Sequence, residues 1–141
     1  MDFFTAFHIS ASALSAQRVR MNIVSSNLAN AQSTETPEGG PYRRKDVVFS
    51  ATPSSDSFHS ILKDKLNAVT VADIVSDPRP FKSVYDPYHP SADQNGYVYY
   101  PNVNIIEEMV NLMSATRSYE ANISVIKATK NMALKALDIG R

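Results

Sequence analysis

The sequence NIIEEMVNLMSATRSYEANISVIKATKNMALKALDI, from Asn104 to Ile139, decides the fold of this chain. Two adjacent rows of mostly apolar residues repeat in it every seven positions, which is the pattern of a long amphipathic helix with a coiled-coil seam. A helix over 104–139 would be roughly 54 Å long at 1.5 Å per residue. The first row is Ile105, Leu112, Tyr119, Ile126 and Ala133, and the second is Met109, Thr116, Ile123, Lys130 and Leu137.

Local signals mark both ends of this helix. Asn104 and Glu107 have the spacing of a capping box, with Asn in place of Ser or Thr. Gly140 stands where a glycine commonly ends a helix, and Lys135 suits the negative end of the helix dipole. These signals predict a helix that both starts and stops within 102–141.

The N-terminal segment predicts a second long helix over residues 3–30, roughly 40 Å in length. Asp2 is its candidate N-cap. One row of this helix is strongly apolar, whereas the neighbouring row is only half apolar. The row that repeats every seven residues is Phe7, Leu14, Met21 and Leu28.

The residues between the two helices have a different composition. All eight prolines lie between Pro37 and Pro101, together with three of the four glycines and six of the seven tyrosines. Proline at this density prevents long helices. We therefore predict a mainly α protein: an N-terminal helix in 1–32, a proline-rich β and irregular insert in 33–101, and a C-terminal helix in 102–141. The two terminal parts are expected to form one helical domain and to pack as a coiled coil.

Two short strands are predicted in the first half of the insert, at 46–49 and 68–75, where apolar and β-branched residues cluster. Between them, the polar stretch 51–60 is predicted to be mobile, and 60–67 to form a helical turn or two. The residues expected on one face of the second strand are Val69, Val71 and Val75.

A hairpin is predicted in the second half of the insert. Asn95-Gly96 is a strong turn signal and precedes the β-prone run Tyr97–Tyr100. If this run pairs with Lys82–Tyr85, the residues Asp86–Gly96 form a long connection stiffened by proline.

Composition excludes several functions. With 14 basic and 14 acidic side chains the net charge is zero, so no nucleic-acid or anionic-membrane partner is indicated. The absence of cysteine excludes disulfides, thiolate metal sites and cysteine nucleophiles, and it suits an oxidising compartment. No stretch approaches the ~20 apolar residues that a membrane span needs. Asp2 stands where a secretory signal has basic residues, so we expect no cleaved signal peptide.

No arrangement of catalytic or metal-binding residues is recognisable. None of His8, His59 and His89 has another histidine or a cysteine at ligand spacing. Glu107 and Glu108 point about 100° apart on a helix and cannot share a substrate, and the helix dipole explains their place in the first turn. We therefore predict no enzymatic activity, no cofactor and no metal.

Four charged residues are candidates for polar contacts between subunits. The run Arg43-Arg44-Lys45 is too short for a nucleic-acid patch and is better explained as an exposed turn or an ion-pairing contact to a neighbouring subunit. On the C-terminal helix, charges beside the seam are either solvated or form inter-helix ion pairs that set register. The four candidates are Arg43, Arg44, Arg117 and Glu120.

Helices this long with narrow apolar rows cannot both be buried in a compact chain of 141 residues. Either they form an antiparallel helical hairpin within a monomer, or their seams are assembly surfaces in an oligomer. Periodicity alone leaves both interpretations open.

A resemblance to a known family favours assembly. The stretches that carry it are SALSAQRVRMNIVSSNLANA, TPEGGPYRRKDVVF and VYDPYHPSADQNGYVYYPNVNIIEEMVNLMSATRSYEANISVIKATKNMALKAL. With these stretches the chain resembles the axial proteins of the bacterial flagellum, and more narrowly flagellar basal-body rod proteins of the proximal-rod type.

This resemblance implies a structural subunit that polymerises with itself and with other rod subunits into a helical drive shaft in the periplasm. It also implies export from the cytoplasm, unfolded, through the flagellar type III apparatus and without a cleaved signal. The terminal helices would pack around a central channel, with the insert facing outward. The alternative is a soluble coiled-coil adaptor or secreted effector that forms a small closed oligomer.

The run SSNLANA, Ser25 to Ala31, ends the first helix with residues that compete for helical hydrogen bonds. Between close-packed subunits, its small side chains would let neighbours approach, and Asn27 and Asn30 would bond across to adjacent helices. Alternatively, Asn30 merely caps a weak last turn. The residues predicted to mediate assembly are Phe7, Leu14, Met21, Leu28, Asn27, Asn30, Ile105, Met109, Leu112, Tyr119, Ile123 and Leu137.

Overall fold

A computed structural model describes residues 3–53 and 67–139 of the chain. The predicted order of helix, insert and helix is confirmed, and each long helix lies within one residue of its expected bounds. The elements in chain order are α1 (Phe3–Ala29), β1 (Lys45–Pro53), β2 (Asn67–Ser76), β3 (Lys82–Tyr85), β4 (Tyr97–Tyr100) and α2 (Ile105–Ile139).

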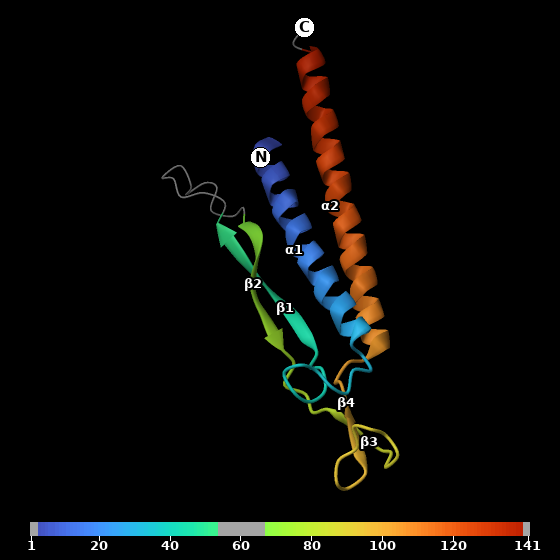
Figure 1. Ribbon diagram of the computed structural model, residues 1–141. Coiled ribbons are helices and arrows are strands. Elements are labelled where there is room, and N and C mark those ends of the chain that lie inside the picture. The colour runs from blue at the N-terminus through green and yellow to red at the C-terminus, as the bar shows by residue number, and fades with distance from the viewer. Residues whose placement is uncertain (1–2, 54–66, 140–141) are drawn as a thin grey trace.

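The two helices run antiparallel and side by side, and α2 extends beyond the start of α1 (Figure 1). The β1–β2 ribbon lies along α1, and the β3–β4 hairpin projects from the end of the molecule opposite to the chain termini (Figure 1). We call the end with the termini the open end and the end with β3–β4 the hairpin end.

Apart from Val24, the most buried positions of the helices are small or polar. On α2 they are Glu108, Ala115 and Thr129, which lie at multiples of a seven-residue spacing. The large apolar rows predicted from sequence lie beside this line, and their members are half-buried or exposed. Small side chains allow helix axes to approach closely, which moves bulky neighbours to the flanks of the contact. The buried residues of α1 are Ser10, Ala16, Val24 and Asn27.

Strands β1 and β2 form an antiparallel ribbon that is longer than the sequence predicted. Its register runs from Lys45 opposite Ser76 to Pro53 opposite Asn67, with an irregularity at Val48/Phe49. Val48 pairs with Asp73 and Phe49 with Val71, so Ala72 is an extra residue and forms a bulge. Because a bulge exchanges the two faces, the prediction that Val75 shares a face with Val69 and Val71 is wrong.

Strands β3 and β4 form the predicted hairpin. Lys82 pairs with Tyr100 and Tyr85 with Tyr97, and residues 86–96 connect them. Gly96 has a φ of 80°. A Cβ at this position would lie 2.9 Å from Cε2 of Tyr85. The tyrosine ring packed over the turn therefore requires glycine here.

Three local predictions concern residues outside the described ranges: the cap at Asp2, the stop at Gly140, and the mobile and helical segments where they cover 54–66. The parts of those segments that the structure describes are strand, because 51–53 belongs to β1 and Asn67 to β2. The prediction of a mobile stretch and a helical turn was wrong for these residues. The ladder of β1 and β2 extends beyond the apolar residues of each strand, to Pro53 opposite Asn67.

Candidate functional site: a polar junction and two apolar surfaces

Asn27 forms the centre of a buried polar cluster at the hairpin end of the helices. Its side-chain amide donates to the Lys45 carbonyl at 2.7 Å and to Oε2 of Glu108 at 2.9 Å. Its Oδ1 accepts from the Lys45 N–H and the Tyr42 hydroxyl, both at 3.0 Å. All four hydrogen-bonding positions of the amide are therefore used within the chain. The bond to Glu108 crosses to the adjacent helix α2, as predicted, but within the same chain, and a role of Asn27 in contacts between subunits stays a prediction.

Glu108 binds a second cluster member with its other oxygen. Nε of Arg44 donates to Oε1 at 2.8 Å, and the Glu108 side chain has no exposed surface. Nη1 of Arg44 also lies 3.1 Å from Asp46 and 3.4 Å from Asp77. Burial opposes the charge on Arg44, but the carboxylates of Glu108 and Asp46 outweigh burial and raise the pKa of its guanidinium.

Asp77 connects this cluster to the insert. Nη2 and Nε of Arg79 lie 2.6 Å and 2.8 Å from Oδ2 of Asp77. The hydrogen bonds from Arg79 lower the pKa of Asp77 to about 2. Asn102 accepts the Arg44 N–H at 2.8 Å and donates to the Arg79 carbonyl at 3.0 Å. We call the following set the polar junction: Asn27, Tyr42, Arg44, Asp77, Asn102 and Glu108.

The four candidates for polar contacts between subunits fall into two groups. Arg44 is buried in the polar junction, and Arg43 donates to the Asp77 carbonyl at 2.9 Å and lies 4.3 Å above the Phe81 ring. The interpretation of this run as an exposed turn is therefore wrong for Arg44, which is buried with partners in its own chain, whereas contacts of Arg43 and Arg44 between subunits stay a prediction. Arg117 and Glu120 are exposed on α2.

The ends of both helices are fixed by asparagine. Oδ1 of Asn104 accepts the N–H of Ile106 at 3.1 Å, which confirms the N-cap of α2. Asn30 donates to the Ser26 carbonyl at 2.9 Å and accepts from the Ser33 hydroxyl at 3.2 Å. For Asn30 the capping interpretation is therefore the one that the structure supports.

The sequence analysis did not predict that Glu108 is a buried hydrogen-bond and ion-pair partner, because the helix dipole already explained an acidic residue in the first turn. It missed the burial of Arg44 because this residue stands in a basic run next to a turn. A local signal existed for neither residue, since their contact spans 64 positions.

The residues predicted to mediate assembly lie at different depths in the single chain. Leu14, Met21, Leu28, Leu112, Tyr119 and Ile123 are half-buried. Those that are exposed are Phe7, Ile105, Met109 and Leu137.

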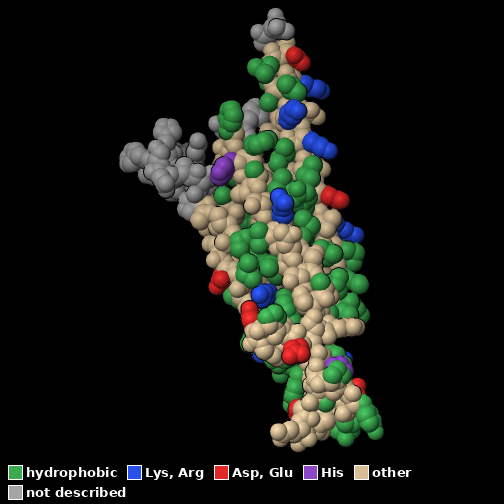
Figure 2. Space-filling view, viewed as in Figure 1, with side chains coloured by type: hydrophobic (Ala, Val, Ile, Leu, Met, Phe, Trp, Pro, Cys, Tyr) green, Lys and Arg blue, Asp and Glu red, His purple; other side chains and the backbone are tan. Residues whose placement is uncertain are grey.

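Two apolar surfaces of the helices have no cover within the described chain. The first, which we call the outer stripe, lies on the first turns of α2, where hydrophobic side chains gather in the space-filling view (Figure 2). Its four residues are 48% to 74% exposed. They are Ile106, Met109, Val110 and Met113.

The second surface is a groove of about 600 Å³ at the open end, between the start of α1 and the end of α2. Phe4 is 84% exposed and Leu137 is 71% exposed there. We call it the open-end groove. Its lining residues are Phe4, Phe7, Thr129, Lys130, Ala133, Ala136 and Leu137.

Comparison with known proteins matches both helical ends of the chain to flagellar families. Residues 7–35 match the family described as flagella basal body rod protein, and residues 94–139 match the C-terminal family of the flagellar basal body rod FlgEFG proteins. The flagellar basal-body rod protein FlgC of Bacillus subtilis is 50% identical to this chain, over 97% of this chain and 99% of its own length. The chain belongs to the FlgC family of flagellar basal-body rod proteins.

Relatives in distant bacteria agree with this assignment. FlgC of Escherichia coli O6:H1 is 46% identical over the full length of both chains, and FlgC of Borreliella burgdorferi is 41% identical over 99% of this chain and 98% of its own. The protein is therefore a structural subunit of the basal-body rod that assembles with other rod components, and it is not an enzyme. In the part of the chain that the structure describes, neither helix is long and apolar enough to span a membrane.

Proposed function

We propose that this rod subunit polymerises through its terminal helices, with itself and with other rod subunits, into the proximal part of the axial drive shaft. The outer stripe carries this proposal. Contiguous apolar side chains that stay in water mark an interaction surface. Since neither α1 nor the β1–β2 ribbon covers these residues within 3–53 and 67–139, we infer that a second chain covers them in the rod.

We also infer that α1 and α2 act as one helical domain that packs as a coiled coil in the rod. The seven-residue spacing of Glu108, Ala115 and Thr129 supports this inference, because such a spacing keeps one face toward the partner helix.

Passage through the flagellar export apparatus without cleavage of the N-terminus belongs to the same proposal. Phe4 and Phe7 supply the α1 side of the open-end groove. Cleavage of an N-terminal leader would remove Phe4 and Phe7 from the groove, so we expect the assembled protein to keep its N-terminal residues. N-terminal sequencing of the subunit from isolated basal bodies tests this point.

A matched pair of α2 variants tests the assembly surface. Met113→Glu places a charge in the outer stripe, and we expect the subunit to keep its helical content but to be absent from basal bodies. Ser124→Glu places the same charge on an exposed position of the same helix beyond the stripe, and we expect normal incorporation. Incorporation of the Met113→Glu subunit at the level of the control would contradict the proposal.

Electron cryotomography of cells with the coding sequence deleted and then restored tests the place in the rod. The proposal expects membrane rings without a rod in the deletion, and complete rods after restoration. Complete rods in the deletion strain would overturn it.

A further inference from the structure

All the sulfur of this chain is in methionine. The sequence contains five methionines and no cysteine. Oxidation converts the methionine thioether into a sulfoxide, so an apolar side chain becomes a polar one. Because no thiol of the chain competes for an oxidant, the most accessible methionines are the side chains on which it acts.

The four methionines in the described ranges differ in accessibility and in position. Met109 and Met113 belong to the outer stripe and are 48% and 56% exposed. Met132 is 54% exposed on the same helix, beyond the stripe. Met21 is half-buried on α1, and its sulfur accepts a hydrogen bond from Oγ1 of Thr116 at 3.8 Å. The two stripe methionines and Met132 are therefore open to a dissolved oxidant to a similar degree, and Met21 is less accessible.

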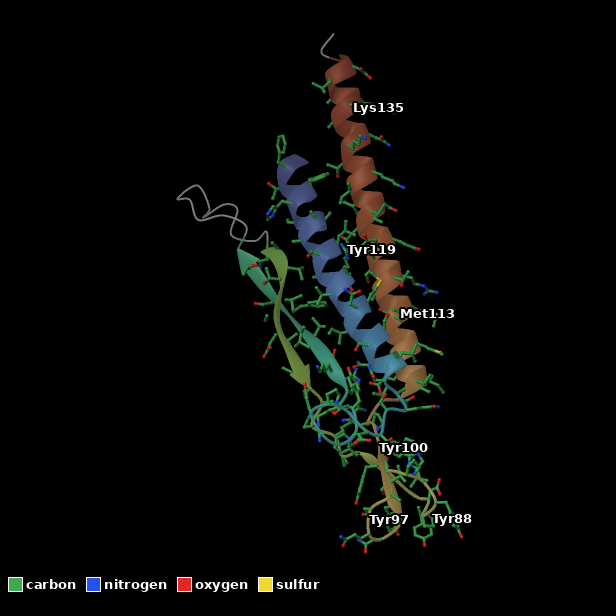
Figure 3. The ribbon with its side chains drawn as sticks, in the orientation of Figure 1. Tyr88, Tyr97, Tyr100, Met113, Tyr119 and Lys135 are labelled. Carbon is green, nitrogen blue, oxygen red and sulfur yellow. The ribbon has the colours of Figure 1, made fainter. Side chains whose placement is uncertain are left out.

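The two stripe methionines lie together on one side of α2. They are four residues apart, a spacing that places side chains on adjacent turns of the same helix face. Met113 lies in the half of α2 nearer the hairpin end (Figure 3). It also lines a hollow of about 300 Å³, so a small oxidant has space beside its thioether. The other residues that line this hollow are Val110, Ser114, Arg117 and Ser118.

From these observations we infer that Met109 and Met113 are a modification site that controls assembly: hypochlorous acid converts their thioethers into sulfoxides, and the oxidised subunit no longer enters the rod. In this step the sulfur loses two electrons and bonds to the oxygen of the acid. The bond between oxygen and chlorine breaks, chlorine leaves as chloride, and the proton is released. The inference rests on the proposed function, because the polarity of the stripe matters only if a second chain covers it.

Oxidation of the stripe opposes burial of the stripe but not folding of the subunit. In the free subunit a sulfoxide at a half-exposed position stays hydrated, so the pairing of α1 with α2 is expected to persist. Contact with a second chain removes this water, and a polar group that is buried without a partner weakens binding by roughly tenfold or more. Methionine sulfoxide reductases restore the thioether, so the block is reversible.

Mass spectrometry of the subunit before and after assembly tests the inference. In cells without methionine sulfoxide reductases, another rod component is withheld, so that the subunit waits unassembled. Sublethal hypochlorite is added and quenched with thiosulfate, and only then is the missing component produced. Sulfoxide at Met109 and Met113 should be roughly tenfold or more scarcer in basal bodies than in the waiting subunit, whereas Met132 should show equal fractions. Equal fractions at Met113, or equal depletion at Met132, would overturn the inference.

Leucine variants test which sulfur atoms matter. One variant combines Met109→Leu with Met113→Leu, and Met132→Leu is the matched control. Each variant is produced together with the natural chain and oxidised before assembly, so damage to other components affects both chains equally. The ratio of variant to natural chain in basal bodies, divided by the same ratio without hypochlorite, should rise severalfold for the stripe variant and stay near one for the control. A value near one for the stripe variant would contradict the inference.

Hypochlorite applied to isolated basal bodies separates this inference from the proposed function. If a second chain covers the stripe, Met113 stays unoxidised there under conditions that oxidise it in the free subunit. Protection of Met113 together with normal incorporation of sulfoxide-bearing subunits would overturn the inference and leave the proposed assembly surface intact. Oxidation of Met113 in intact basal bodies as fast as in the free subunit would overturn both.

Discussion

The two ends of the helical pair differ in how completely the chain satisfies its own side chains. At the hairpin end, the polar junction uses all four positions of the Asn27 amide and both oxygens of Glu108 within the same chain. At the open end, Phe4 and Leu137 line a groove and stay mostly in water. The first end specifies the fold of the subunit, whereas the second leaves apolar surface exposed, which we propose is covered in the assembled rod. Substitutions at the two ends should therefore separate stability from incorporation.

Removal of Glu108 should have the largest effect on stability. Glu108→Ala removes the buried carboxylate that pairs with Nε of Arg44 and accepts one N–H of Asn27, and we expect a loss of about 3–5 kcal/mol in the free energy of unfolding. Urea unfolding followed by circular dichroism measures it. Arg44→Met combined with Glu108→Leu should recover most of the loss, because it removes both charges. The exposed Glu120→Ala serves as control, and an equal loss there would contradict the role of the junction.

Asn27→Ala should have the second largest effect on stability. It removes the partner of the Lys45 N–H and leaves a buried Glu108 oxygen unpaired, which is expected to cost about 1–3 kcal/mol. Asn30→Ala removes only a partly exposed cap and should cost less, so the difference between the two unfolding midpoints measures the junction. Equal midpoints would show that the Asn27 bonds contribute nothing beyond a cap.

Acid should weaken the link between the junction and the insert. Unfolded Asp77 binds its proton near pH 3.9, whereas the folded residue binds it only near pH 2. The stability that Asp77 supplies is therefore complete above about pH 4 and lost as the pH falls toward 2. In the Asp77→Asn variant, the dependence of unfolding free energy on pH between 4 and 2 should be shallower than in the natural protein. An unchanged slope would rule out this contribution.

Leu137→Ser should have the smallest effect on stability. The side chain is 71% exposed, so its removal should change the unfolding free energy by less than about 0.5 kcal/mol. Incorporation into basal bodies, followed by immunoblotting, should nevertheless fall. If Leu137→Ser lowered the unfolding free energy but left incorporation unchanged, the open end would contribute to the stability of the subunit and not to its assembly.

The parts of the fold that depend on local signals could be predicted from sequence. Proline distribution, seven-residue repeats and the Asn104 cap placed both long helices, and Asn95-Gly96 placed the β3–β4 hairpin. The bulge at Ala72 could not be predicted, because it depends on how β2 pairs with β1.

The candidate site was predicted less well. Apolar repeats indicated which helix faces matter, but the closest packing uses Ala115, Thr129 and other small residues that such repeats do not detect. The ion pair between Arg44 and Glu108 was not predicted, because the sequence around each residue already explained its charge. The helix dipole explained Glu108, and a basic run at a turn explained Arg44. Contacts of this kind are visible only after the helices have been placed side by side.

The hydrogen bond between Asn27 and Glu108 has a consequence for the timing of folding, because it joins residues 81 positions apart. Closing so large a loop costs chain entropy before any contact can offset it. A chain that leaves a ribosome or a channel with its N-terminus first cannot form this bond until residue 108 has emerged. Until then Asn27 can bond only to Tyr42 and Lys45, and Arg44 can pair only with Asp46 and Asp77, so the junction lacks its link to α2. The position of Glu108 in the chain thus delays the native state until at least the first 108 of the 141 residues are outside.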